Sequence, residues 1–427
     1  MEHSEVKEMT ASVYMSSLGG SGENGRNCHL IEYNDQIILL DCGVKREVID
    51  GTVGFYPALT HEIVEKITCV FLSHCHEDHV ASLPLLYHLG YTGKVYATKE
   101  TIMETPGFIK KWTGFVKKQN GCLPYDEEDI ENIQFEPVKL GKQKIHDFEV
   151  TLGRTGHVLG ATWFVFEIAD KKVLYTGDMV LHSATLATDL PSLCDGAIMN
   201  GAYAGKILSQ ENQYKKLLNV CKETYSNGGS VLLPIPPKGR GIDITLFLDE
   251  NLDNANIYVE KAVIDSMNKL IQNTQWIKNG LSNDLSSNVV IVSNPEERKA
   301  ALNANQGIYI TGDGMITTDV SMVYYESIKQ STLNKIVITG HAANGTIGAG
   351  VLDEEFCLKN NVKSSADKII FKVHLDDDDI FQLCKHINAS KIVLFHADKE
   401  NNKDIAERLQ KENIEVKTLL YPDKWEI

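Results

Sequence analysis

The stretch SHCHEDHV, residues 73–80, decides the fold of this 427-residue chain. It follows an apolar run at 67–72 and precedes the helix-like segment ASLPLLYHL, so it occupies the turn between a buried strand and a helix. Imidazole and carboxylate groups are the ligands that Zn²⁺ and similar divalent ions prefer. A solvent-exposed polar loop is the alternative, but the density of such groups behind an apolar strand argues against it. The stretch therefore predicts a metal site that contains His74, His76, Asp78 and His79.

Further ligand-type residues lie after other apolar runs. Asp41 ends ILLD, Asp178 ends LYTGD, His396 ends IVLFH, and His157 follows FEVTL in the segment GRTGHVLGAT. Any one of them alone is typical of a turn or a helix cap. In open α/β sheets, however, binding sites gather outside the carboxyl ends of the strands. We therefore expect these four residues to lie at the same site as the histidine-rich turn.

Composition and charge limit the classes of protein to consider. The chain is 43% hydrophobic and 23% charged, which is ordinary for a folded globular protein. The formal charge of −16 argues against non-specific coating of nucleic acid by the whole surface. No apolar run approaches the ~20 residues of a membrane span, and the opening MEHSEVKEMT is not a secretory signal. Nine scattered cysteines without a CxxC pair predict a cytoplasmic protein with reduced thiols.

The order of the segments predicts one α/β unit inserted into another. Short β-rich runs fill the chain up to about residue 200 and return after residue 367. Between them, NQYKKLLNVCKETYSNGG reads as an amphipathic helix ended by Gly228 and Gly229, and the strand SVLLPI follows. The acidic run Asp376 to Asp379 is expected to cap or begin the helix DDIFQLCKHIN.

The ligand pattern resembles the metallo-β-lactamase superfamily. HCHEDH matches the HxHxDH motif, and Asp41, His157, Asp178 and His396 match the other metal-region motifs in the expected order. The resemblance implies an α/β fold, the four-layer αβ/βα sandwich, with two zinc ions per chain. It also implies one zinc on His74, His76 and His157 and the other on Asp78, His79 and His396, with Asp178 bridging. Asp41 would orient the cluster.

Other segments resemble the β-CASP nucleases within that superfamily. They are GGSGENGRNCHLIEY, GHVLGATWFVFEI, GGSVLLPIPPKGRGIDI, GDGMITTD and ITGHAANGTIGAG. His374 fits the family's motif B, and His396 fits motif C in the form associated with RNA-directed members. The resemblance implies that residues 201–367 form a β-CASP cap, inserted between the two parts of the metallo-β-lactamase domain at 1–200 and 368–427.

Three positions depart from the β-CASP pattern. Asn200 stands at motif A, where the family has Asp or Glu, so His374 would lose a charged partner and become a poorer general acid with a more acidic optimum. Neutral drift with intact chemistry is the alternative. Ala349 follows the Gly-Thr-Ile-Gly turn where Arg or Lys is usual, and the HxSxH phosphate pocket of the RNase J branch is missing. We therefore disfavour 5′-monophosphate-dependent exonuclease action.

The resemblance implies a zinc-dependent hydrolase of RNA phosphodiester bonds, acting as an endoribonuclease on single-stranded RNA. A metal-bridging hydroxide would attack phosphorus, and His374 would be the general acid. Mn²⁺ or Fe²⁺ could replace zinc, and a homodimer stays open. The expected catalytic residues are Asp78, Asp178 and His374, and the expected substrate contacts are Lys238, Arg240, Asn200 and Thr346. The alternatives are a hydrolase of a small-molecule ester or phosphodiester and a catalytically weakened RNA-binding protein.

The segment FIKKWTGFVKK, residues 108–118, interleaves lysines with aromatic residues. Its lysines could meet phosphates while its aromatic rings stack on bases. The alternative is an ordinary amphipathic helix with a solvated lysine face, and the sequence alone favours that alternative slightly.

Overall fold

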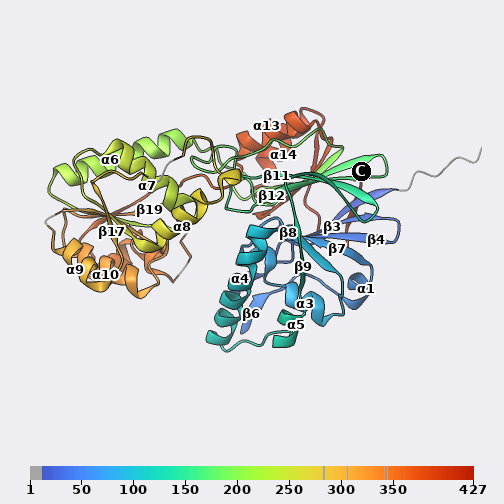
Figure 1. Cartoon of the computed structure of the whole chain (residues 1–427), viewed down its shortest axis with the longest axis horizontal. Coiled ribbons are helices and arrows are strands. Elements are labelled where there is room, and N and C mark those ends of the chain that lie inside the picture. The colour runs from blue at the N-terminus through green and yellow to red at the C-terminus, as the bar shows by residue number, and fades with distance from the viewer. Residues whose placement is uncertain (1–11, 282–283, 305, 341, 344) are drawn as a thin grey trace, which may run out of the picture. The chain divides into compact units, whose positions relative to one another are not determined.

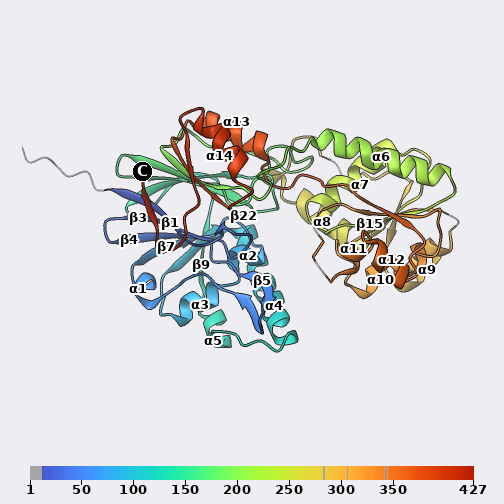
Figure 2. The ribbon, with the colours of Figure 1, turned by 180° about the vertical axis from the view of Figure 1, so that it is seen from behind.

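The computed structural model describes residues 12–281, 284–304, 306–340, 342–343 and 345–427. His341 and Asn344 of the segment ITGHAANGTIGAG and the opening MEHSEVKEMT lie outside the described residues. The chain forms two compact units (Figures 1 and 2). The sandwich unit comprises the residues up to Leu181 together with Thr188–Ile207 and His374–Ile427. The inserted unit comprises His182–Ala187 and Leu208–Val373.

Within the described residues, the sandwich unit contains two seven-stranded sheets of the same design. In each sheet three antiparallel pairings are followed by three parallel ones. The first has the order β24 (Lys424–Glu426), β1 (Val13–Gly19), β3 (Cys28–Tyr33), β4 (Gln36–Leu40), β7 (Ile67–Phe71), β8 (Lys94–Thr98), β9 (Gln134–Val138). The second has the order β10 (Gly141–Ile145), β11 (Phe148–Arg154), β12 (Thr162–Ile168), β13 (Lys171–Tyr175), β14 (Gly196–Asn200), β21 (Lys391–Phe395), β23 (Glu415–Lys417).

The two sheets pack face to face, and helices cover their outer faces (Figure 1). Side chains of both sheets, such as Phe71 and Phe164, share one buried core. A second core lies under α13 (Asp377–Ile387) and α14 (Lys403–Gln410). A third lies under the helices of the other outer face, which are α1 (His61–Val64), α2 (Glu77–Val80), α3 (Leu83–His88), α4 (Lys99–Lys118) and α5 (Glu127–Glu131). The four-layer αβ/βα sandwich predicted from the motifs is therefore confirmed.

Two small pairings complete the sandwich unit. Strands β2 (Ser21–Gly22) and β22 (Ala397–Asp398) pair in parallel next to His396. Strands β5 (Lys45–Ile49) and β6 (Thr52–Phe55) form a hairpin that packs against α4, where Trp112 donates a hydrogen bond from Nε1 to the Tyr56 hydroxyl at 3.1 Å.

The inserted unit is an α/β unit around a six-stranded parallel sheet. Its strand order is β17 (Val289–Val292), β16 (Ile257–Glu260), β18 (Ile308–Thr311), β15 (Val231–Pro234), β19 (Lys335–Ile338), β20 (Ser365–Lys368). Its helices are α6 (Gln210–Ser226), α7 (Arg240–Asn251), α8 (Lys261–Ile271), the short 3₁₀ helix at Thr274–Trp276, α9 (Pro295–Asn303), α10 (Asp319–Ile328), α11 (Ile347–Gly350) and α12 (Glu354–Lys359). In the part of the chain that the structure describes, neither unit has a helix that combines the length and the apolarity of a membrane span.

A short segment that precedes β14 belongs to the inserted unit. The Thr185 hydroxyl donates a 2.5 Å hydrogen bond to Asp243, and Leu186 forms a β-bridge with Ile277. This segment could not be predicted from the sequence, because its six residues have neither a strand-like nor a helical period.

Candidate metal centre

The ligand-type residues gather at the carboxyl ends of strands of the sandwich unit. Asp41 follows β4, the histidine-rich turn follows β7, Asp178 follows β13 and His396 follows β21. The register of the parallel pair β14 and β21 places Asn200 opposite Phe395, one residue before His396. Asp41 and His396 both have positive φ angles, +58° and +64°. Such angles are uncommon for residues other than glycine, and they often mark functional sites.

One cluster of ligand atoms forms around His76. His74 Nε2 lies 3.0 Å and His157 Nε2 lies 3.3 Å from His76 Nδ1. Both outer nitrogens lie 3.6 Å from Asp178 Oδ2. Imidazole nitrogens that face one another and a carboxylate at these distances form a donor set that fits a divalent cation.

A second cluster shares the same aspartate. His396 Nε2 lies 2.9 Å from Asp78 Oδ2, and His79 Nε2 lies 3.5 Å from the same oxygen. The carboxylate of Asp178 faces both clusters, because Oδ1 lies 3.4 Å from His79 Nε2, while Oδ2 lies 3.6 Å from His74 Nε2 and 3.8 Å from His396 Nε2. All seven residues that the sequence predicted as metal ligands are therefore brought together, with Asp178 between the two groups.

Buried side chains behind the clusters hold the ligands in place. Asp41 accepts a hydrogen bond from His79 Nδ1 at 2.6 Å, and it also accepts from the Ser73 hydroxyl at 2.6 Å and the Tyr175 hydroxyl at 2.5 Å. Asn27 Nδ2 lies 3.1 Å from Asp78 Oδ2. The expected orienting position of Asp41 is therefore observed. The sequence predicts no role for Ser73, Tyr175 or Asn27. Only the Gly-rich turn before Asn27 and the position of Ser73 beside the histidines could have indicated them.

The amide of Asn200 points at the shared aspartate. Asn200 is fully buried, and its Nδ2 donates a 2.7 Å hydrogen bond to Asp178 Oδ1. Its Oδ1 accepts a 3.3 Å hydrogen bond from the backbone N–H of Ala202, which fixes the orientation of the amide. The structure therefore gives Asn200 a contact with a predicted metal ligand.

His374 lies beside the first cluster, and the carboxylate that it faces is Asp178, which that cluster also contains. Its Nδ1 is 3.6 Å from Asp178 Oδ2, and its ring lies 5.1 Å from the His157 ring and 5.2 Å from the Tyr203 ring. Among the described residues, Nδ1 has no hydrogen-bond partner. The ring is therefore oriented by packing.

Burial and the mutual charges set the protonation of the ligands. Burial and, next to it, the charge of the neighbouring His157 lower the pKa of His76 to about 3, although the carboxylates of Asp78 and Asp178 act against the shift. Burial alone would raise the pKa of Asp178, but the charges of His79 and His396 hold it well below its usual range. His79 is opposite: burial acts to lower its pKa, yet Asp178, Asp78 and Asp41 raise it well above normal. A cation that binds at the second cluster must therefore displace a proton from His79.

The other predicted substrate contacts belong to the inserted unit. Arg240 begins α7, Lys238 precedes it, and Thr346 caps α11 by accepting from the Ala349 N–H at 3.3 Å. Arg240 lies against Gly340, since a Cβ added there would meet its guanidinium at 2.3 Å. The role of these three residues toward a substrate stays a prediction.

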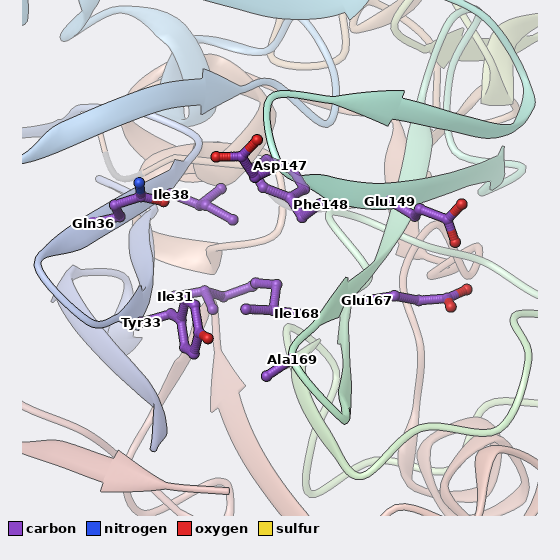
Figure 3. A pocket seen from close by; sticks show the side chains of 10 residues that line it. All are labelled: Ile31, Tyr33, Gln36, Ile38, Asp147, Phe148, Glu149, Glu167, Ile168 and Ala169. Carbon is purple, nitrogen blue, oxygen red and sulfur yellow. The ribbon is translucent and has the colours of Figure 1, made fainter. Parts of the chain in front are cut away.

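Two other features of the sandwich unit are distinct from the clusters. His88, Asp126 and Asp129 form a small exposed group, in which His88 Nδ1 lies 2.9 Å from Asp129 Oδ2. A cavity of about 500 Å³ is lined by residues of both sheets, with the carboxylates of Glu149 and Glu167 pointing to the same side (Figure 3). Its lining residues include none of the metal-type clusters.

Comparisons with known families match the chain in three consecutive parts. Residues 21–222 match the model described as the metallo-beta-lactamase superfamily. Residues 241–351 match the Beta-Casp domain, and residues 361–419 match the Zn-dependent metallo-hydrolase RNA specificity domain.

Several curated proteins are similar to the chain at about one quarter identity. The transcription termination factor FttA of Methanococcus maripaludis is 26% identical, over 85% of this chain and 62% of its own length. The protein named Probable RNase MJ4 of Methanocaldococcus jannaschii is 26% identical over 89% of this chain and 92% of its length. Endoribonuclease YSH1 of Candida albicans is 26% identical over 89% of this chain but 48% of its length. The chain thus spans less than two thirds of FttA and about half of YSH1.

A solved structure shares the fold. It is a protein of unknown function from Enterococcus faecalis, with a TM-score of 0.63 and 14% identity over 97% of this chain and the whole of that chain.

Proposed function

The chain belongs to the β-CASP family of the metallo-β-lactamase superfamily, and from that premise we propose that it hydrolyses phosphodiester bonds in single-stranded RNA as an endoribonuclease. The observation that carries the proposal is the pair of histidine and aspartate clusters that share Asp178. The match to an RNA specificity domain and the names of two relatives as ribonucleases support the choice of RNA.

The donor set supports two divalent cations. His74, His76 and His157 would hold one, Asp78, His79 and His396 would hold the other, and Asp178 would serve both. Imidazole and carboxylate ligands favour Zn²⁺, with Mn²⁺ or Fe²⁺ as alternatives. When bound, such a pair supplies an activated water and neutralises charge that develops on the phosphoryl group.

His374 is the proposed proton donor to the leaving oxygen. Burial lowers its pKa well below the usual value, although Asp178 acts in the opposite direction. A phosphodiester carries a negative charge, and that charge raises the pKa of an adjacent imidazole. The ring would therefore take up its proton when substrate is bound. Because Asn200 brings no charge near it, we expect an acidic optimum for cleavage.

The test is cleavage of an end-labelled single-stranded RNA by zinc-loaded protein from acidic to alkaline pH. Asp178→Asn is the matched variant, because it keeps the shape of the side chain and removes its charge. Internal fragments that disappear with Asp178→Asn are the expected result. If two metals per chain are bound but no RNA is cut at any pH, a small-molecule ester or phosphodiester becomes the substrate to examine.

The contact between Asn200 and Asp178 favours one second candidate, an RNA-binding protein with weakened catalysis. In this case the carboxylate of motif A is replaced by an amide that hydrogen-bonds the predicted metal ligand Asp178 and brings no second charge to His374. RNA binding with single-turnover cleavage far below that of a β-CASP nuclease assayed alongside would favour this candidate.

A further inference from the structure

Helix α4 brings an aromatic side chain to the edge of the first cluster. The Phe108 ring lies 5.5 Å from the His76 ring in an edge-to-face arrangement. Lys111 Nζ lies over the same Phe108 ring, 4.5 Å from its centroid. The Phe108 ring therefore contacts both the Lys111 ammonium group and His76, a predicted metal ligand. Lys111 is exposed to solvent.

The same face of α4 continues away from the cluster. Residues three and four apart lie in one row on a helix, and the row runs through Phe108, Lys111, Phe115 and Lys118. Phe108 and Phe115 are half-buried, whereas both lysines are exposed. Trp112, by contrast, is fully buried in the core under the helix. Aromatic and cationic side chains thus alternate along this face. We call these four residues the α4 row.

Neighbouring side chains fix the far end of the α4 row. The guanidinium of Arg46 lies 4.3 Å over the Phe115 ring. Arg46 also forms a bidentate ion pair with Glu77 at 2.7 and 2.6 Å, so its charge is already compensated. Glu77 belongs to the same turn as the metal ligands. Arg46 therefore ties the hairpin, the metal-site turn and α4 together.

Two glycines flank the row and leave its backbone open. Gly107 and Gly114 lie within α4, and a Cβ added to either one would meet no atom within 4 Å. A glycine inside a helix lowers helix stability by about 1 kcal/mol relative to alanine. Close packing does not require a glycine at either position. Because neither glycine has a side chain, the space beside the backbone at these two positions stays open.

Resting on the proposed function, we propose that the α4 row is a binding track for the single-stranded RNA segment next to the scissile phosphate. Lys111 contacts a backbone phosphate, and a base packs against the half-buried Phe108 ring. Charge complementarity selects this occupant. In a chain of net charge −16, exposed lysines gather on this helix, and no carboxylate of the described residues lies within 4.0 Å of Lys111 Nζ.

The first measurement is binding of a fluorescein-labelled 20-nucleotide unstructured RNA to the full-length zinc-loaded chain by anisotropy. The reading is taken before cleavage, and RNA integrity is checked on a gel. Lys111→Ala is expected to weaken binding and to reduce the slope of log K against log [salt] by ~0.7, the value for one phosphate contact on a single strand. Phe108→Leu keeps an apolar contact with His76, and it is expected to weaken binding about five-fold or more through lost stacking.

The matched control is Lys117→Ala. Lys117 lies on another face of α4 and pairs with Glu127 at 3.6 Å, so its removal is expected to leave both the affinity and the salt slope unchanged. Equal losses for Lys111→Ala and Lys117→Ala would reduce the effect to general electrostatics and overturn the proposal.

Steady-state cleavage separates this inference from the proposed function. Lys111→Ala is expected to raise KM for the 20-nucleotide RNA more than for a dinucleotide, with a smaller change in kcat. If the parent chain cleaves RNA but the two substrates respond equally to Lys111→Ala, the track is wrong and the nuclease assignment stands. If the parent chain cleaves neither substrate but the anisotropy pattern holds, the nuclease assignment fails and the track stands.

Discussion

At the scale of single residues, the most informative side chain is one that departs from its family. The sequence predicted that Asn200 occupies motif A and weakens His374 by bringing no charge. The structure adds a contact that no spacing rule could predict, the 2.7 Å hydrogen bond from Asn200 to Asp178. If Asp178 binds a metal ion as proposed, Asn200 would control the orientation and basicity of that carboxylate.

Replacing Asn200 tests that role. Asn200→Ala removes the donor to Asp178 and is expected to lower metal affinity ~10–100-fold, the usual effect of losing such a partner. Asn200→Asp places two carboxylates in contact, so the metal-free protein is expected to melt at a lower temperature and to gain more from added Zn²⁺ than the parent. Competition with a chromogenic chelator and thermal melts give both quantities. Unchanged metal affinity in Asn200→Ala would show that Asp178 is held by other contacts.

Asp313, in the segment GDGMITTD, allows a pH test away from the metal site. Burial acts to raise its pKa, but hydrogen bonds from the N–H groups of Met315, Thr317 and Thr318 and from the Ser321 hydroxyl bring it below the ordinary 3.8. A lowered folded-state pKa contributes stability above pH ~4 that is lost as the pH falls through the folded value.

Asp313→Asn is therefore expected to cost ~1 kcal/mol of unfolding free energy near pH 7. The difference from the parent is expected to shrink below pH ~4, where the parent carboxylate becomes protonated. Urea titrations at several pH values measure it. A difference that stays constant down to pH 3 would mean that the charge of Asp313 contributes nothing.

At the scale of elements, caps and buried pairs connect each helix to its neighbours. The acidic run before α13 behaves as predicted, because Asp376 caps the helix by accepting from the Asp379 N–H at 3.0 Å. In the inserted unit, Glu260 is the last residue of β16, and its carboxylate is buried. It accepts from Arg298 of α9 at 2.8 and 3.0 Å and from the Tyr324 hydroxyl of α10 at 2.7 Å. One carboxylate thus joins three elements.

Replacing Arg298 is expected to lower the free energy of unfolding far more than replacing an exposed cation. Arg298→Met leaves Glu260 buried without compensation and is expected to cost ~3–5 kcal/mol. Lys261→Met, whose partner Asp265 is exposed, is expected to change stability by less than ~0.5 kcal/mol. Chemical denaturation compares the two. The double variant Arg298→Met with Glu260→Gln is expected to recover part of the lost unfolding free energy. If it recovers none, lost packing of the Arg298 side chain explains the destabilisation instead.

At the scale of the whole molecule, the resemblance of the motifs to a known superfamily implied the four-layer sandwich. The position of the ligand-type residues after strands predicted that they gather at one site. The sequence could not predict the supporting contacts of Asn27, Tyr175 and Asn200, which depend on the register between strands far apart in the chain. It also missed His182–Ala187, whose place in the inserted unit depends on tertiary partners alone. Local sequence patterns indicate whether a segment is a helix or a strand and which residues can bind a metal. They do not predict the register between strands that are far apart in the chain.

The two units have separate cores, so metal removal is expected to affect them unequally. Chelation is expected to lower the melting transition of the sandwich unit and leave that of the inserted unit unchanged. At a free metal concentration 100 times Kd, the bound ion contributes about 2.7 kcal/mol. Calorimetry with and without chelator, with Arg298→Met marking the inserted unit's transition, tests this. Equal shifts of both transitions would mean that the units unfold together.

The position of His396 also has a consequence for biosynthesis. The strand that delivers it, β21, pairs in parallel with β14, yet the whole inserted unit lies between them in the chain. A ribosome therefore completes His74, His76, His157 and Asp178 long before it completes the second cluster. Until His396 has emerged, the nascent chain holds one finished ligand group beside an unfinished one. If the proposed hydrolysis of RNA needs both groups, it would therefore begin only after His396 has been synthesised, and the messenger RNA beside the ribosome would be spared until then.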